Sequence, residues 1–198
     1  MISLKTNSKG EYVDAPGKRS RSIYTPGQSE DFKISRSKLT DFRKCPKCFY
    51  LDRVAGLVSP STPGWTLNAR TDELLKKEFD ECREKAIPHR AMKANGLKHV
   101  VPFEHKEMDK WRDSLRHGLR ARFKSTNIIL HGGVDDIWWD TKTEQVIVVD
   151  YKSQANKNPV NPETYLYSTH RRWYKEQMDF YAYLLHEMGF DVSGFDDA

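Results

Sequence analysis

Hydrophobic and polar residues are patterned most sharply between residues 131 and 153. This stretch predicts two strands, roughly 134–140 and 145–152, joined by a polar turn around 142–143. The second strand carries four β-branched residues in a row, at 146–149, which is typical of a strand that is covered on both faces. The pattern therefore predicts a β-hairpin in the interior of the fold.

The predicted hairpin brings acidic residues together at one end. If the chain folds back at this turn, residue 137 lies opposite 148, and Asp135 lies opposite Asp150, with their Cβ atoms about 5 Å apart. Side chains alternate along a strand, so Lys152 emerges on the same face as Asp150. Two carboxylates this close repel each other unless a cation lies between them, and oxygen ligands favour Mg²⁺ or Mn²⁺. The alternative is a surface hairpin whose acidic residues are solvated.

Apolar residues at helical spacing predict several helices. A short helix begins at Ser35 or Ser37 as N-cap, and Pro46 interrupts it before a second helical segment that ends near Gly56. Residues 127–130 are expected to form the first strand of the sheet. Longer helices are predicted at 67–85, about 105–123, and about 170–188, where Gly189 ends the last one. The helix at 105–123 would carry a basic strip, formed by Lys106, Lys110, Arg112, Arg116, Arg120, Arg122 and Lys124.

Length and composition limit the class of protein. The 198 residues, of which 31% are charged, have a mean hydropathy of −0.78 and predict one soluble domain over 31–198, preceded by a flexible basic arm over 1–30. No apolar run approaches the roughly 20 residues that span a bilayer, and residues 1–22 lack the apolar segment of a secretory signal. Three cysteines without an export signal favour reduced thiols in a cytoplasmic protein. The net charge of +5 is compatible with a polyanionic partner.

Three short motifs occur in a defined order along the chain. Gly132-Gly133-Val134-Asp135 has the form G-x-x-D, an apolar strand ends in Asp150-Tyr151-Lys152 (D-x-K), and Gln177 and Tyr181 form Q-x-x-x-Y on a helix. Together they resemble the PD-(D/E)XK nuclease superfamily, in particular its RecB-like branch. The resemblance implies an α/β fold with a restriction-endonuclease-like core, in which helices flank a central mixed β-sheet.

The same resemblance implies a function and a set of site residues. It implies a DNA nuclease, exonuclease-like, that hydrolyses phosphodiester bonds with Mg²⁺ or Mn²⁺. Asp135 and Asp150 are the expected metal ligands together with the Tyr151 backbone carbonyl, and Lys152 is expected to orient the attacking water or neutralise the transition state. Gln177 is expected to position the nucleophile or substrate, with Tyr181 beside it. Arg171, Arg172 and Lys175 are expected to contact phosphates at the entrance of the last helix.

The chain also departs from the family's pattern. A metal-binding His of RecB-like nucleases would fall at Asp72, which we expect to serve as an oxygen ligand, with Glu73 as the alternative. Both acidic residues could instead simply favour the N-terminal end of their helix. Related nucleases also continue with further strands after the last helix, whereas this sequence ends soon after it. These departures motivate an alternative, a nucleic-acid-binding module that keeps the nuclease fold without catalysis.

The cysteines raise a separate question. An S-x-S-x-L segment from Ser35 to Leu39, followed by Cys45-Pro46, is similar to CRISPR-associated adaptation nucleases, which hold an iron–sulfur cluster with four cysteines. The sequence has only Cys45, Cys48 and Cys82, so we expect no such cluster. A zinc site that uses these three cysteines and a histidine, in a zinc-stabilised interaction protein, is one interpretation, and packing thiols are the other. The biological setting, whether repair, phage replication or defence, is open.

Overall fold

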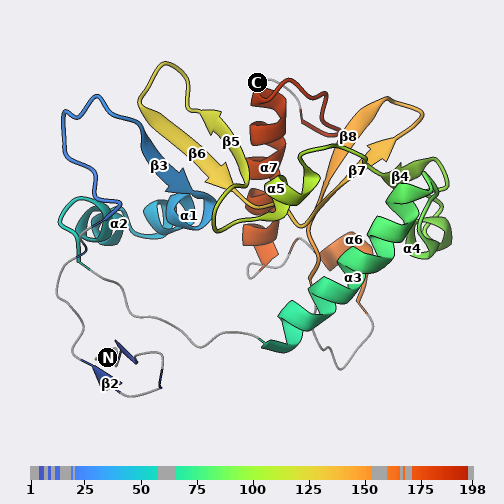
Figure 1. Cartoon of the computed structure of the whole chain (residues 1–198), viewed down its shortest axis with the longest axis horizontal. Helices are drawn as coiled ribbons and strands as arrows, with labels where there is room; N and C mark the ends of the chain where they lie inside the picture. The colour runs from blue at the N-terminus through green and yellow to red at the C-terminus, as the bar shows by residue number, and fades with distance from the viewer. Residues whose placement is uncertain are drawn as a thin grey trace. The chain divides into compact units, whose positions relative to one another are not determined.

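The computed structural model describes residues 5–6, 9, 12–13, 19, 21–57, 66–152, 160–165, 167 and 171–195 (Figure 1). Contacts divide the chain into two units. The first joins Met1–Gly64 to Arg122–Leu130, and the second joins Trp65–Ala121 to His131–Ala198. The expected boundary between an arm and a domain near residue 30 stays a prediction. No helix in the described part of the chain is long and apolar enough to cross a membrane.

The first unit contains short strands and two helices. Strand β1 (Lys5–Thr6) pairs with β2 (Tyr12–Val13), and β3 (Phe32–Ser35) leads into α1 (Arg36–Lys44) and α2 (Pro46–Arg53). The predicted helix start is confirmed, because Ser35 is the N-cap residue of α1. The predicted interruption is confirmed as well: Pro46 lacks an N–H to donate and stands as the first residue of α2.

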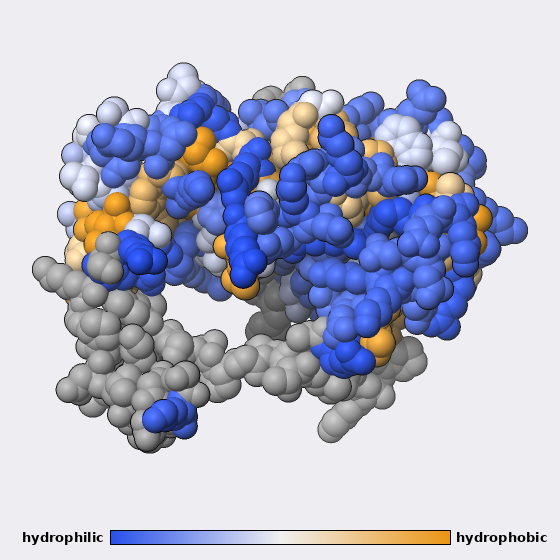
Figure 2. Space-filling view, in the orientation of Figure 1, coloured by the Kyte–Doolittle hydropathy of each residue, from blue (hydrophilic) through white to orange (hydrophobic). Residues whose placement is uncertain are grey.

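Apolar side chains of the first unit line a hollow of about 270 Å³. Phe42 and Phe123 are among the lining residues and are partly exposed. Figure 2 shows orange, hydrophobic surface beside blue, hydrophilic surface over this unit.

A three-stranded sheet that does not contain the hairpin corrects one expectation. Strands β3, β6 (Ile128–Gly132) and β5 (Leu119–Arg122) lie in the order β3-β6-β5, so the strand expected near 127–130 is confirmed but belongs to a sheet apart from the hairpin. The helix expected at 105–123 is wrong. Only α5 (Met108–Arg112) is helical there, and the following residues form a loop and then β5.

The loop before β5 shows why this helix ends early. The Asp113 carboxylate accepts the backbone N–H groups of Leu115 and Arg116, which competes with helix continuation. Gly118 adopts φ +75° and approaches Gly132 so closely that a Cβ on it would lie 2.7 Å from the Gly132 carbonyl oxygen. Leu115 is 94% exposed, so it does not pack as a residue on the buried face of a helix would. The seven basic residues therefore do not share one helical face.

The hairpin is confirmed in its predicted register. Strands β7 (Asp136–Asp140) and β8 (Gln145–Val149) are antiparallel, with Ile137 opposite Val148 and Trp139 opposite Val146. Strand β4 (Val100–Pro102) pairs with β7, which gives the order β4-β7-β8. A parallel bridge between Val146 and Val192 makes this sheet mixed. The expected α/β class is confirmed, with the strands divided between small sheets.

Helices cover both faces of this sheet. Helix α3 (Thr66–Glu84) packs through Phe79 on one face, where the ring stacks on Trp138 at a centroid distance of 5.3 Å. Helix α7 (Arg172–Glu187) contacts β8, and its Leu184 and Leu185 are fully buried, a gain of about 1.5–3 kcal/mol each. The predicted end of α7 is confirmed, because Gly189 has φ +92°. Two short helices, α4 (Arg90–Ala94) and α6 (Pro162–Tyr165), complete the unit.

Candidate active site

The two predicted carboxylates meet where the hairpin strands end. Asp135 immediately precedes β7 and Asp150 immediately follows β8, so the confirmed register brings them to the same end of the hairpin. The Tyr151 backbone N–H donates to Asp135 Oδ2 at 2.9 Å, which closes this end. The position of Asp135 relative to β8 is thus set by backbone structure.

Asp150 contacts one residue of its own motif and one residue of the Q-x-x-x-Y motif. Its side chain is 7% exposed and forms an ion pair with Lys152, as strand alternation predicted. Gln177, from α7, donates from Nε2 to Asp150 Oδ1 at 2.7 Å. Lys152 and Gln177, which are expected to act together with Asp150, therefore both contact its carboxylate.

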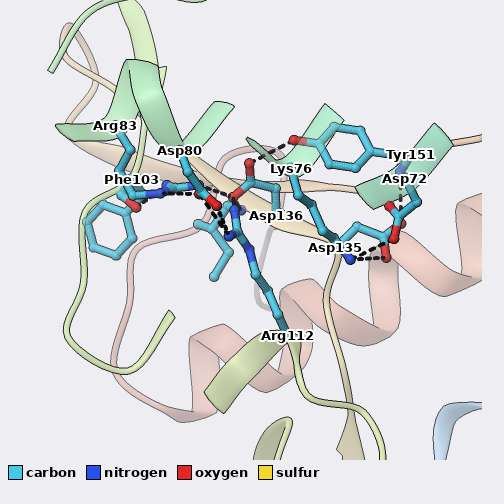
Figure 3. Close-up of polar contacts among 10 residues, drawn as sticks. Asp72, Lys76, Asp80, Arg83, Phe103, Arg112, Asp135, Asp136 and Tyr151 are labelled. Carbon is cyan, nitrogen blue, oxygen red and sulfur yellow. Dashed lines mark hydrogen bonds and ion pairs between the residues drawn. The ribbon is translucent and has the colours of Figure 1, made fainter. Parts of the chain in front are cut away.

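Asp135 faces a lysine that sequence reasoning missed (Figure 3). Lys76 Nζ of α3 donates to Asp72 Oδ2 at 2.8 Å and lies 3.8 Å from Asp135 Oδ1. The signal was the spacing: Lys76 is four residues after Asp72, one turn along the same helix face. The Oδ1 atom of Asp72 is buried and has no hydrogen-bond partner in the described structure.

The carboxylates around Asp135 carry more negative charge than the neighbouring lysines neutralise. Burial raises the pKa of Asp135, and the negative charge of Asp150 raises it further. The Tyr151 N–H and Lys76 lower it only in part. Three carboxylates, Asp72, Asp135 and Asp150, face two lysines, so the group favours one further cation or a proton.

Asp136, the next residue, occupies a different environment that sequence reasoning also missed. It is fully buried and accepts from Arg83 Nη2 at 2.6 Å and Arg112 Nη2 at 2.8 Å through Oδ1. The Tyr151 hydroxyl donates to its Oδ2 at 2.7 Å (Figure 3). Consecutive residues of an extended chain point in opposite directions, so the pair Asp135-Asp136 itself indicated that the two carboxylates would enter different surroundings.

This buried network supports the backbone on either side of Tyr151 and so bears on Asp150 and Lys152 indirectly. Burial and the negative charge of Asp136 both raise the pKa of Tyr151, so its hydroxyl remains a proton donor. Tyr151 stands between Asp150 and Lys152 in the chain, and its ring also packs against Phe79. Anchoring Tyr151 on one face of the sheet fixes the backbone from which Asp150 and Lys152 project on the other.

Tyr181 and Gly132, from different motifs, are packing partners. Tyr181 is 5% exposed, and its Cε1 atom would lie 2.8 Å from a Cβ added to Gly132. Only glycine allows the ring this close to the backbone that leads to Asp135. The Tyr181 ring thus packs against the backbone at Gly132, the first residue of the segment that leads to Asp135.

The three predicted phosphate-binding residues lie at the start of α7. The Arg171 guanidinium carbon is 3.9 Å from the Tyr165 ring centroid. Arg172 Nε lies 3.3 Å from Glu176 Oε1 and the Arg172 side chain is largely exposed, while Lys175 is exposed. A nucleic-acid contact by these residues stays a prediction.

The donor set has the chemistry of a site for a hard divalent cation. Carboxylate oxygens dominate it, the Asp72 Oδ1 atom lacks a hydrogen-bond partner among the described residues, and the raised pKa of Asp135 shows that its negative charge is only partly compensated. In the described ranges, no group of three or more His, Cys, Asp or Glu side chains is placed to hold a metal. The suitability of the site for a divalent cation therefore rests on the pair Asp135 and Asp150. Glu73, the alternative to Asp72, pairs with Arg70 and Lys77 at the surface.

The cysteines are divided between the two units. Cys45 and Cys48 belong to the first unit, where Cys45 Sγ accepts the Cys48 N–H at 3.2 Å, and Cys82 belongs to the second. All three are free thiols. Cys48 is exposed, so the interpretation of all three as buried packing thiols is wrong for it.

Comparison with known proteins returns one family. The model of the PD-(D/E)XK nuclease superfamily matches residues 64–194, about two thirds of the chain. This range includes all three motifs and every residue of the carboxylate group, and it excludes Cys45 and Cys48. No curated protein and no solved structure matches the chain.

Proposed function

Since the chain belongs to the PD-(D/E)XK nuclease superfamily, we propose that it hydrolyses phosphodiester bonds of DNA with Mg²⁺ or Mn²⁺. The observation that carries the proposal is the contact of Asp150 with both Lys152 and Gln177, at the hairpin end that also holds Asp135. The superfamily supplies the nuclease class. The DNA substrate, the metal and an exonuclease-like mode are our proposals.

The metal ligands in this proposal are Asp135 and Asp150. The backbone carbonyl of Tyr151 would be a further ligand. Asp72 is not placed to share an ion with these two carboxylates while it pairs with Lys76, so it would join them only after that ion pair opens. A bound divalent ion supplies a water of lowered pKa and stabilises charge on the phosphate. With two lysines already among the three carboxylates, the site would accept a divalent ion with Lys76 displaced from Asp135, to which it is held only at 3.8 Å.

The remaining residues would position and neutralise. Lys152 is compact and positively charged, which suits the stabilisation of the pentavalent phosphorane or the orientation of the attacking water. Gln177 would hold Asp150 in place through its amide N–H and present its carbonyl oxygen to the water. Tyr181 would act as a positioning residue, because its ring supports the backbone that leads to Asp135.

The substrate would approach along the start of α7. Arg171, Arg172 and Lys175 lie in its first turn or immediately before it, on the helix that also carries Gln177. Phosphates bound there would belong to the same nucleic-acid strand as the scissile phosphate, which would lie at Lys152. The assignment to the RecB-like branch, the relation to CRISPR-associated adaptation nucleases and the cytoplasmic location stay predictions.

One observation favours a second candidate function. Lys76 lies between Asp72 and Asp135, so a fixed cation already neutralises part of the carboxylate group. A chain that kept this arrangement would bind nucleic acid on the nuclease fold without cutting it.

Cleavage of labelled DNA separates the two functions. Native protein is incubated with linear and circular DNA, and with RNA of the same sequence, in Mg²⁺, in Mn²⁺ and in EDTA. We expect loss of linear DNA only with metal, and the circular substrate distinguishes exonucleolytic from endonucleolytic action. Tight DNA binding without cleavage in any metal would establish the binding module instead.

A further inference from the structure

A hollow in the second unit adjoins the proposed active site. It has a volume of about 470 Å³, and both Asp150 and Lys152 line it. The other walls are mainly apolar and aromatic, with side chains that include Trp138, Tyr165, Tyr174 and Met178. The volume falls within the roughly 300–1,000 Å³ of small-molecule sites, so the hollow is in the size class of sites that take a group such as a single nucleobase.

The sheet topology explains why a hollow forms here. Strand β8 is the outer strand in the order β4-β7-β8, and the bridge from Val192 meets it at Val146, its second residue. Residues 147–149 farther along β8 line the hollow. Tyr174 and Met178, one turn apart on α7, form the facing wall, and Tyr165 of α6 adds another.

Two of the tyrosine rings carry cations beside them. Lys152 Nζ lies 5.3 Å from the centroid of the Tyr174 ring, so this lysine contacts both Asp150 and an aromatic wall. Arg171 lies over Tyr165 and donates from Nη1 to its backbone oxygen at 3.2 Å, which fixes that residue. Aromatic faces for a base thus lie next to positive charges for the phosphates on either side of it.

We infer that this hollow binds one unpaired nucleobase of the substrate strand, next to the phosphate held at Asp150 and Lys152. This inference rests on the proposed function and specifies its substrate as single-stranded nucleic acid or the frayed end of a duplex. A base inside a duplex must first leave its stack to enter such a pocket, which costs a few kcal/mol per base and disfavours intact duplex.

The first test measures binding without cleavage, using the native chain in EDTA. Affinity is measured for a short labelled single strand, for the blunt duplex of the same sequence, and for single strands with one abasic site moved along the sequence. We expect the single strand to bind about tenfold more tightly than the duplex, and an abasic site to cost about tenfold at one position. Equal affinity for all of these substrates would overturn the inference.

A set of variants assigns the effect to the hollow. Tyr174→Ala removes one aromatic wall and is expected to weaken single-strand binding about tenfold, whereas Tyr174→Phe keeps the ring and should bind as the native protein does. Tyr167→Ala is the control, because Tyr167 is 87% exposed and does not line the hollow. A 2-aminopurine base at the sensitive position should lose fluorescence on binding to the native chain and to Tyr174→Phe, but not to Tyr174→Ala. Identical quenching by all three would contradict a base stacked on Tyr174.

The base pocket and the nuclease can fail separately. If the protein cleaves single strands and blunt duplex equally in Mg²⁺ and no abasic site alters binding, the base pocket is wrong while the nuclease stands. If no metal supports cleavage but binding depends on the Tyr174 ring, the pocket stands and hydrolysis is wrong.

Discussion

At the scale of single residues, two adjacent aspartates show how neighbouring carboxylates acquire different tasks. Asp136 is fully buried but satisfied by Arg83, Arg112 and the Tyr151 hydroxyl. Asp135, just before the strand, is buried beside Asp150 with less compensation, and its pKa is raised. Such uncompensated charge is costly to the fold and is typical of functional sites. The sequence indicated the pair Asp135 and Asp150 but carried no direct sign of the arginines that hold Asp136.

Replacing Asp135 with Asn should stabilise the protein at neutral pH. Because burial and Asp150 raise the pKa of Asp135 in the folded state, the folded state favours the protonated form, and stability is lost as pH rises from the unfolded pKa through the raised one. Asn mimics the protonated acid, so we expect a gain of about 1 kcal/mol at pH 7 that shrinks toward pH 4. Urea unfolding in EDTA at both pH values measures this, and lower stability of Asp135→Asn at pH 7 would refute it.

The same substitution one residue later should have the opposite effect. Asp136→Asn leaves Asp80 as the one remaining carboxylate that the described residues offer to Arg83 and Arg112, and loss of one partner of a buried ion pair costs about 3–5 kcal/mol. The two variants are matched in size and chemistry, so each serves as the control for the other in the urea experiment. Equal effects on the free energy of unfolding would contradict the assignment of the two side chains to different electrostatic environments.

At the scale of elements, local patterns predicted the hairpin and failed where distant backbone segments meet. Its register followed from the alternation of β7 and β8 and from their turn, both of which are written in adjacent residues. The helix expected at 105–123 had the right periodicity, but it stops after Arg112. The close approach of Gly118 to Gly132 depends on a tertiary contact, which no local period encodes. Lys76 was missed for a related reason, since its role depends on where α3 lies against the hairpin.

The contact between the G-x-x-D segment and α7 yields an element-scale prediction. Gly132→Ala places a methyl group 2.8 Å from Tyr181 Cε1, and such overpacking costs about 1–3 kcal/mol. In a Tyr181→Ala background the same change should cost much less, because the ring is absent. Urea unfolding of the four proteins gives the coupling energy, and strict additivity of the two substitutions would contradict this packing.

The start of α7 provides a further prediction. If Lys175 contacts a phosphate, Lys175→Gln should weaken DNA binding similarly for all sequences and reduce the slope of log affinity against log salt by about 1. Lys142→Gln is a matched control, because Lys142 is also exposed and lies at the turn, the hairpin end away from Asp150. Fluorescence anisotropy over a salt series measures both slopes, and identical slopes for the two variants would exclude a contact by Lys175.

At the scale of the whole molecule, charge is divided unevenly between the two units. The first unit has 14 Lys and Arg against 6 Asp and Glu, whereas the second has 19 against 22. The overall charge of +5 therefore conceals a basic unit and a slightly acidic one that holds the carboxylate site. The discontinuous first unit could not be predicted, because long-range contacts such as Arg122 Nη1 to Asp31 Oδ1, at 2.8 Å, hold it together. The motifs, by contrast, were sufficient to indicate the superfamily that the match over 64–194 establishes.

The most direct test of the central claim compares the initial rate of single-stranded DNA cleavage by native protein and by Asp150→Asn in Mg²⁺. Asp191→Asn is the control, because Asp191 accepts from Gln145 Nε2 at the start of β8, away from the site. We predict that Asp150→Asn lowers the rate about a hundredfold or more while the control cleaves like the native protein, and that EDTA abolishes cleavage by both. Cleavage by Asp150→Asn at the native rate would contradict a metal-dependent nuclease centred on Asp135 and Asp150.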